Sequence, residues 1–282
     1  MTAPKRPTRR TRATTAVPLL VIIATACAAL AAPAPAKRTA THGGVRITFD
    51  VTLAREATGR IVPASLLDAP SDKPDGVYPE HVAFTLVGMP DAPADSFEPV
   101  LRVSSVEKYL KAFSVSPVYV KDAERTLNEL RRLVRRRPAA LKGNVPQLPF
   151  PDGTEIFHAR VKHLSFRGGS GVAFLTQGQQ DDSLINSQQT SYEFRGLTDD
   201  GRFYVSATFP FGAPVLAPNR DAARHDGHTL LLYPGRANAR DKRRYAAYVE
   251  RVRLKLERLR PAQFTPDLRL YDELLSSIEI RK

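Results

Sequence analysis

A block of strand-like sequence at residues 156–211 constrains the fold more than any other part of the chain. It holds four apolar segments separated by turns that contain glycine. In its last segment, residues 203–211, aromatic and aliphatic residues alternate with polar ones, a period of two that puts the aromatic set on one buried face of a strand. Gly201 stands where a hairpin needs a positive φ, which joins this segment to residues 192–195. The block therefore predicts four strands in an antiparallel meander.

The rest of the chain predicts elements that extend or cover this block. Ser116-Pro117 begins a helix and Pro138 ends it, and a second long helix stops at Pro261. Predicted strands lie at residues 45–53, 81–87, 99–103 and 276–280, and predicted helices at 106–113, 116–137 and 239–259, with a last helix starting at 265–267. The expected fold class is α+β, a mainly antiparallel sheet covered by the two long amphipathic helices.

The first 36 residues have the three parts of an export signal. A basic stretch precedes an apolar run at residues 17–30, and a small-residue exit follows at 31–36. Cys27, the single cysteine, lies in a weak match to a lipoprotein box. Lipidation at Cys27, ordinary cleavage and an uncleaved anchor all remain open. The chain is expected to be exported and to be periplasmic, extracellular or membrane-anchored as a lipoprotein, with no transmembrane helix after cleavage.

Residues 37–282 are expected to form a single α+β domain. At 282 residues and 42% apolar composition, the chain can bury a conventional core. A linker at residues 138–151, which carries Gly143, Pro146 and Pro149, could instead mark a boundary between two domains. The single-domain interpretation is favoured because the strands before the linker have no self-sufficient set of partners.

Two stretches of the central block, residues 161–177 and 192–207, resemble a group of uncharacterised exported bacterial proteins and lipoproteins. The resemblance implies export and a shared fold, and it carries no activity. More loosely, the helix and short strand at residues 268–280 look like the end of a PsbP/Mog1-like α/β/α sandwich. That likeness concerns the fold alone.

The formal charge of +13 favours an anionic partner. Five of these charges lie in the leader, so its removal leaves +8. The candidate anion-binding residues lie on the two long helices, and they are Arg131, Arg132, Arg135, Arg136, Arg243, Arg244, Arg251 and Arg258. They form one surface if both helices lie on the same side of the sheet; the alternative is a solvated helix face. An anionic membrane surface or a wall polymer is the expected partner, and nucleic acid is not expected for an exported chain.

No catalytic residue, metal site or cofactor is predicted. Ser170 lies in a glycine-rich hairpin turn and does not form a G-x-S-x-G elbow. His225 and His228 lie in the long loop at residues 212–240 without the spacing of a metal site. The sequence favours an exported, envelope-associated binding or accessory protein without catalytic activity. The alternative is a secreted hydrolase with its site in the 212–240 loop.

Overall fold

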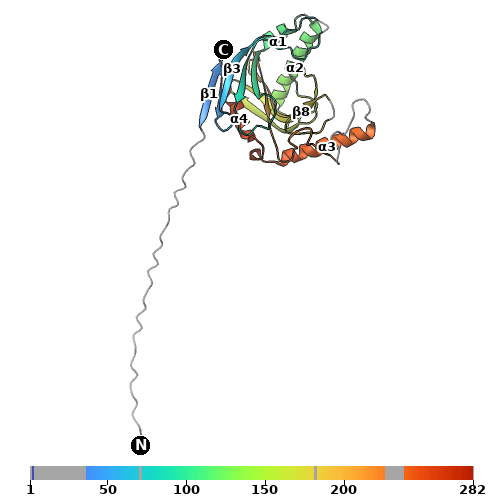
Figure 1. Cartoon of the computed structure of the whole chain (residues 1–282). Helices are drawn as coiled ribbons and strands as arrows, with labels where there is room; N and C mark the ends of the chain where they lie inside the picture. Colours follow the sequence, from blue (N-terminus) through green and yellow to red (C-terminus); the bar gives the residue numbers. More distant parts are fainter. Residues whose placement is uncertain (1, 3–35, 70–71, 181–182, 226–237, 282) are drawn as a thin grey trace. The chain divides into compact units, whose positions relative to one another are not determined.

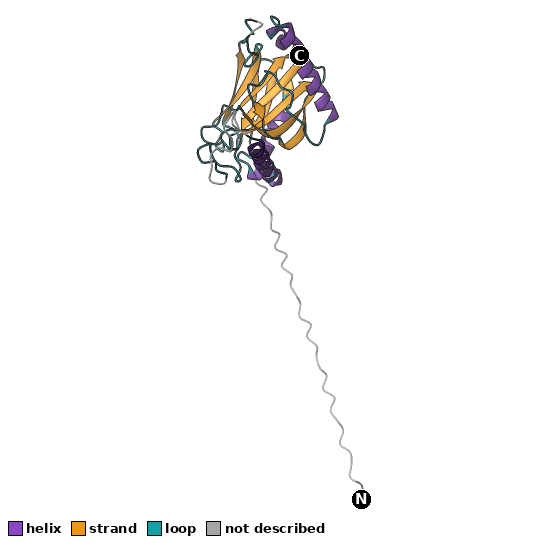
Figure 2. Cartoon of the chain, turned by 90° about the vertical axis from the view of Figure 1, so that its right-hand side faces the viewer, coloured by secondary structure: helices purple, strands orange, loops and turns teal. Residues whose placement is uncertain are grey.

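The structure is a computed structural model that describes residues 2, 36–69, 72–180, 183–225 and 238–281. Residues 35–282 form one compact unit. The predicted leader, with Cys27, lies outside the described residues. The fold is α+β with antiparallel sheets, and helices lie at the margins of the strands (Figure 2).

The predicted meander forms the centre of the larger sheet. It consists of β7 (Ala159–Phe166), β8 (Gly169–Gln179), β9 (Thr190–Thr198) and β10 (Phe203–Pro210), each antiparallel to the next. The tight turns use Gly168 at φ 76° and Gly201 at φ 70°, a conformation that costs glycine little. The antiparallel meander expected from the sequence is therefore present.

Three further strands extend the sheet from β10. They are β5 (Val100–Ser105), β4 (His81–Val87) and β3 (Glu56–Val62), and the sheet order is β3-β4-β5-β10-β9-β8-β6, with β7 also paired to β8. The short strand β6 (Thr154–Glu155) pairs with the end of β8. The sequence analysis did not predict β3 or β6.

A smaller sheet joins the beginning and end of the compact unit. Its order is β1 (Lys37–His42), β2 (Val45–Asp50) and β11 (Glu279–Ile280). The Ser277 hydroxyl accepts a hydrogen bond from Thr48 N at 2.7 Å and lies 2.8 Å from Thr48 O. The predicted strand at 45–53 is too long, because Asp50 accepts hydrogen bonds from Thr52 and turns the chain there.

The two long helices pack on different parts of the larger sheet. Helix α2 (Pro117–Arg136) and the short α1 (Val106–Ala112) bury apolar residues against Leu197 and Tyr204. Helix α3 (Ala239–Arg258) and α4 (Leu268–Ser276), joined by η1 (Pro261–Gln263), belong to the main core with Tyr192 and Phe209. Leu197 and Tyr192 lie five residues apart on β9, and Tyr204 and Phe209 lie five apart on β10. The two side chains of each pair therefore point to opposite faces of the sheet. Figure 1 shows α1 and α2 together and α3 apart from them.

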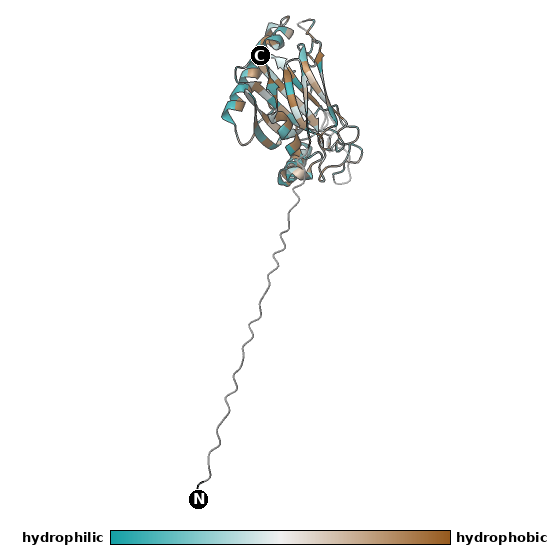
Figure 3. Cartoon of the chain, turned by 90° about the vertical axis from the view of Figure 1, so that its left-hand side faces the viewer, coloured by the Kyte–Doolittle hydropathy of each residue, from teal (hydrophilic) through white to brown (hydrophobic). Residues whose placement is uncertain are grey.

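The finer expectation, a sheet covered by two long helices, is not confirmed. The face that carries Tyr192 and Phe209 packs mainly against α4 and the strand β2, while α3 contacts β7 at the margin. Hydrophobic and hydrophilic residues are intermixed over the strands and helices (Figure 3). The helix pattern that predicted α2 and α3 identified the buried stripe of each helix, but a periodicity does not say which face of a sheet the stripe covers.

Candidate anion-binding groove

The structure separates the eight predicted arginines into two groups. Four lie on α2, which packs against Leu197 and Tyr204, and four lie on α3, which contacts β7. Whether the two groups act as one surface stays a prediction. All eight are exposed except Arg131, which is half-buried with its guanidinium against the turn at Gly201.

Each group contains arginines with and without a partner. On α3, Arg251 Nη2 lies 3.0 Å from His225 Nε2 and Arg244 also has a partner, whereas Arg243 and Arg258 form no ion pair or side-chain hydrogen bond with described residues. On α2, Arg131 donates to Asn128 Oδ1 at 2.6 Å. Within the described part of the chain, the three remaining α2 arginines form no ion pair or hydrogen bond through their side chains; they are Arg132, Arg135 and Arg136. These cations lie in the last two turns of α2, where they also suit the helix dipole.

The segment after α2 turns back and forms a groove with the helix. Arg137 adopts the left-handed conformation at φ 46° and ends the helix before Pro138. Residues 138–146 then run beside the helix and enclose a cavity of about 450 Å³. Arg132, Arg136 and Lys142 line this cavity, with Glu129 as its one carboxylate. We call this cavity the α2 groove. Its lining has a net positive charge.

The floor of the α2 groove is apolar. Leu133, Leu141 and Val145 line the cavity. The same three residues pack together with Val172 and Phe174 of β8 in a small core cluster. The groove therefore combines cations at its rim with a hydrophobic base that belongs to the sheet.

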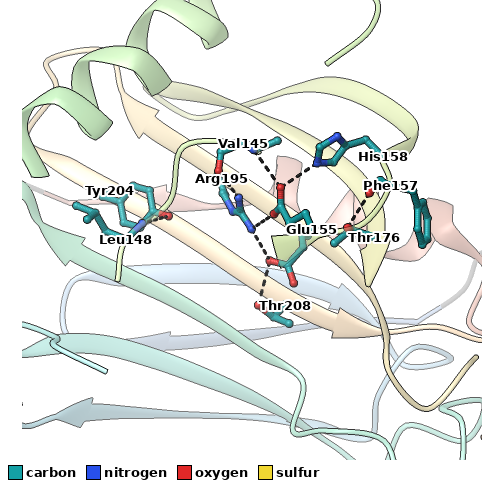
Figure 4. Close-up of polar contacts among 10 residues, drawn as sticks. Val145, Leu148, Glu155, Phe157, His158, Thr176, Arg195, Tyr204 and Thr208 are labelled. Atoms are coloured by element: carbon teal, nitrogen blue, oxygen red, sulfur yellow. Dashed lines mark hydrogen bonds and ion pairs between the residues drawn. The ribbon is translucent and has the colours of Figure 1, made fainter. Parts of the chain in front are cut away.

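A buried charge cluster fixes the loop wall of the groove (Figure 4). Arg195 of β9 donates to Val145 O at 2.6 Å and to Glu155 Oε1 at 2.5 Å. Glu155 Oε2 accepts a hydrogen bond from Val145 N at 3.0 Å, so both backbone groups of Val145 are bound to charged side chains. Further along the loop, Leu148 N donates to the hydroxyl of Tyr204 at 3.3 Å. Hydrogen bonds to charged groups each contribute about 1.5–3 kcal/mol, which is enough to hold this loop in one position.

The side chains of the cluster are largely buried. The side chains of Arg195 and Glu155 are 5% and 9% exposed. His158 Nε2 lies 2.8 Å from Glu155 Oε2, and the Arg195 guanidinium lies 5.2 Å from the centre of the Phe174 ring. Burial pushes the pKa of Glu155 upward, but the hydrogen bond from His158 and the charge of Arg195 outweigh it, and the pKa is lowered. Glu155 is therefore held as a carboxylate paired with Arg195.

Glu193, the second carboxyl group of the cluster, is less well compensated. Its Oε2 lies 3.7 Å from Arg195 Nη2 and accepts a hydrogen bond from Thr208 at 3.2 Å. Burial raises its pKa, and the charge of Arg195 opposes this rise without cancelling it. Arg195 is thus shared between two carboxyl groups, with the shorter contact to Glu155.

A second basic cavity lies on the other side of the loop. It has a volume of about 510 Å³ and shares Ala140 and Leu141 with the α2 groove. Its cations are already engaged: Lys162 pairs with Asp272 at 2.5 Å, and Arg253 pairs with Glu250 at 2.7 Å. An anion would have to compete with these carboxylates. The α2 groove, whose cations have no such partners, is the better candidate.

Lys142, Arg195 and Glu155 were not predicted from the sequence as parts of this site. Residues 138–151 were predicted to be a linker, and residues 138–146 of this segment form a wall of the groove. One signal was present in the sequence: Glu193 and Arg195 are charged residues inside an apolar strand, and such residues need buried partners.

The alternative hydrolase site lies partly outside the described residues, because they exclude 226–237 and therefore His228. His225 is described, and its ring lies 4.9 Å from that of Tyr248. His163 Nε2 lies 3.0 Å from Pro138 O, and Ser170 lies within β8, opposite Ser165 of β7 and Leu197 of β9. Among the described residues, no group of three or more His, Cys, Asp or Glu side chains could hold a metal ion.

Comparison of the chain with protein-family models, with curated proteins and with solved structures gave no match. The resemblance to exported bacterial proteins and the looser likeness to the PsbP/Mog1-like sandwich stay predictions. Within the described residues, no helix is both long enough and apolar enough to cross a membrane.

Proposed function

We propose that this chain is an exported, envelope-associated binding or accessory protein, without catalytic activity, that contacts anionic lipid or wall polymer through an arginine-rich face. Of the eight arginines predicted from the sequence, the proposal retains those at the end of α2. There Arg132, Arg135 and Arg136 stand beside Lys142 of the loop.

The observation that carries the proposal is that three cations without a partner among the described residues, Arg132, Arg136 and Lys142, line one groove. Elsewhere on the surface many cations are paired, as in Lys108 with Glu80 at 2.7 Å and Lys37 with Glu273 at 3.0 Å. These cations gather around a single carboxylate, that of Glu129, so they repel one another, and an anion relieves that repulsion when it binds. A net formal charge of +8 after loss of the leader adds a general attraction to anionic surfaces.

Vesicle binding tests the proposal. Each Lys or Arg near an anionic surface contributes about 1 kcal/mol, so three cations contribute about a hundredfold in affinity at low salt. Phosphatidylglycerol vesicles should bind the protein, phosphatidylcholine vesicles should not, and binding should weaken steeply as salt is added. Linear polyphosphate serves as the soluble polyanion in a parallel titration.

The matched variants carry equal changes in charge. Arg132→Gln/Arg135→Gln/Arg136→Gln should lose most of the binding. Arg243→Gln/Lys255→Gln/Arg258→Gln removes three exposed cations of α3 and should retain most of it. Equal losses would assign binding to net charge alone, and salt-independent or absent binding to both probes would end the proposal.

A further inference from the structure

The α2 groove has a shape that a flat anionic surface does not need. Its cations stand at the rim of a hollow of about 450 Å³, a size within the roughly 300–1,000 Å³ range of small-molecule sites. A bilayer surface would reach Arg132, Arg135 and Arg136 equally well if no hollow existed. The cavity therefore favours a ligand that enters as a single molecule.

The chemistry of the groove changes from rim to floor. Arg132, Arg136 and Lys142 provide the charge, and Leu133 and Leu141 provide half-buried apolar surface. The floor rests on Val172 and Phe174, which are completely buried in the sheet. A ligand with an anionic group at one end and hydrocarbon at the other matches both parts.

We infer that the α2 groove binds a single anionic amphiphile. The acidic head group lies among Arg132, Arg136 and Lys142, and the first carbons of the tail lie on Leu133 and Leu141. This inference rests on the proposed function and names the ligand class for the same site. Arg135 is exposed on α2 but does not line the groove, so it contributes to surface attraction and not to the head-group site.

Both walls of the groove are held in place before a ligand arrives. The helix wall is fixed by Leu127, Leu130 and Val134 in the core cluster beneath α2. The loop wall is fixed at Val145 by Arg195 and Glu155. A pre-formed site of this kind avoids much of the ordering cost of binding.

Glu129 gives the groove a built-in opposing charge. It is exposed on α2 and lines the cavity with the cations, and it forms no ion pair among the described residues. A carboxylate there repels an acidic head group. Glu129→Gln should therefore raise the affinity for an anionic amphiphile, a gain that a misfolded variant cannot produce.

Alkyl phosphates of increasing chain length test the inference, with isothermal titration calorimetry below their critical micelle concentrations. Butyl, hexyl, octyl and decyl phosphate should bind progressively more tightly, by about fourfold per methylene, or ~0.8 kcal/mol. The gain should level off once the tail outgrows the groove. Inorganic phosphate alone should bind far more weakly than octyl phosphate.

Three variants separate the two halves of the groove. Arg132→Gln/Arg136→Gln should lower the affinity for every chain length by the same factor, about fivefold per cation lost. Leu141→Asn should reduce the gain per methylene and leave the weak binding of inorganic phosphate unchanged. The control Lys255→Gln/Arg258→Gln on α3 should change neither.

The outcomes also separate this inference from the proposed function. Binding that does not depend on chain length, or that the α3 control weakens as much as the groove variant, overturns the inference. Vesicle binding without saturable binding of octyl phosphate leaves the proposed surface contact standing and overturns the groove ligand. Octyl phosphate binding without vesicle binding supports the groove ligand and contradicts the proposed contact with membrane lipid.

Discussion

Replacing Arg195 with methionine should destabilise the protein by about 3–5 kcal/mol. The substitution removes the 2.6 Å hydrogen bond to Val145 O and the 2.5 Å contact to Glu155, and it leaves Glu155 buried with its charge uncompensated by arginine. Breaking a buried pair by removing one partner costs about this much, because the remaining charge stays out of water. Single domains have total stabilities of roughly 5–15 kcal/mol, so the loss is a large fraction of the whole.

Urea unfolding followed by circular dichroism measures this loss. The m-value should stay constant while the midpoint falls. Adding Glu155→Gln to Arg195→Met should recover about 1 kcal/mol or more, because a neutral amide is cheaper to bury than an orphaned carboxylate. Arg136→Met, at an exposed position without a described partner, is the control and should change stability by less than about 0.5 kcal/mol.

Hydrogen exchange at the Val145 amide reports on the loop itself. In the unaltered protein this amide donates to Glu155 at 3.0 Å and should be protected. In Arg195→Met it should exchange faster than the amides of β8. A cost below about 1 kcal/mol, together with unchanged protection at Val145, would show that the cluster does not hold the loop wall of the α2 groove.

Three further predictions concern other parts of the molecule. Glu193→Gln should stabilise the protein at neutral pH and have little effect below pH 4.5. Burial raises the pKa of Glu193 in the folded chain, so the folded chain holds the carboxyl proton more tightly than the unfolded chain does. The stability of the unaltered protein therefore falls as pH rises from 4.5 through the raised pKa of Glu193. Urea titrations at both pH values check the sign, and equal effects would contradict it. Leu127→Ala, at a position 3% exposed beneath α2, should cost about 2–5 kcal/mol in the same assay, and a cost under 1 kcal/mol would mean that α2 is not packed as described. Ser277→Ala should cost about 1–2 kcal/mol, since it removes the hydroxyl that meets Thr48 N and Thr48 O; an unchanged midpoint would refute that account.

Helix ends and alternating strands could be predicted from local sequence. Ser116-Pro117 and Pro138 bracket α2 because a proline fits a first helical turn and cannot continue a last one. Strand β4 was predicted with its observed bounds because apolar and small residues alternate through it. These signals are local, acting over a few residues, so the predictions they give depend little on tertiary contacts.

Strands β3 and β1 lacked such signals. Gly59 interrupts β3, and a Cβ at that position would lie 2.5 Å from Cβ of His42 in β1, so the close approach of two strands requires glycine there. Strand β1 is exposed or half-buried throughout and shows no apolar alternation. Neither β1 nor β3 has the residue pattern of a typical strand, so their strand conformation depends on tertiary contacts.

The candidate site was harder to predict than the fold. Arg195 and Glu155 are 40 residues apart, and Val145 and Arg195 are 50 apart. The hydrophobic periodicity of the sequence does not indicate contacts between residues so far apart in the chain. The arginines of α2 and α3 were identified from charge alone, but their positions relative to one another depend on where each helix packs on the sheet, and this is a tertiary property.

The small sheet imposes an order of events on the chain. Strand β2 obtains its second neighbour from β11, and Thr48 obtains its side-chain partner from Ser277, 229 residues later. A nascent chain therefore exposes one edge of β2 until residues 277–280 have been synthesised. Contacts of such long sequence separation form slowly. During this delay the edge of β2 stays open to pairing with other chains and to proteolysis.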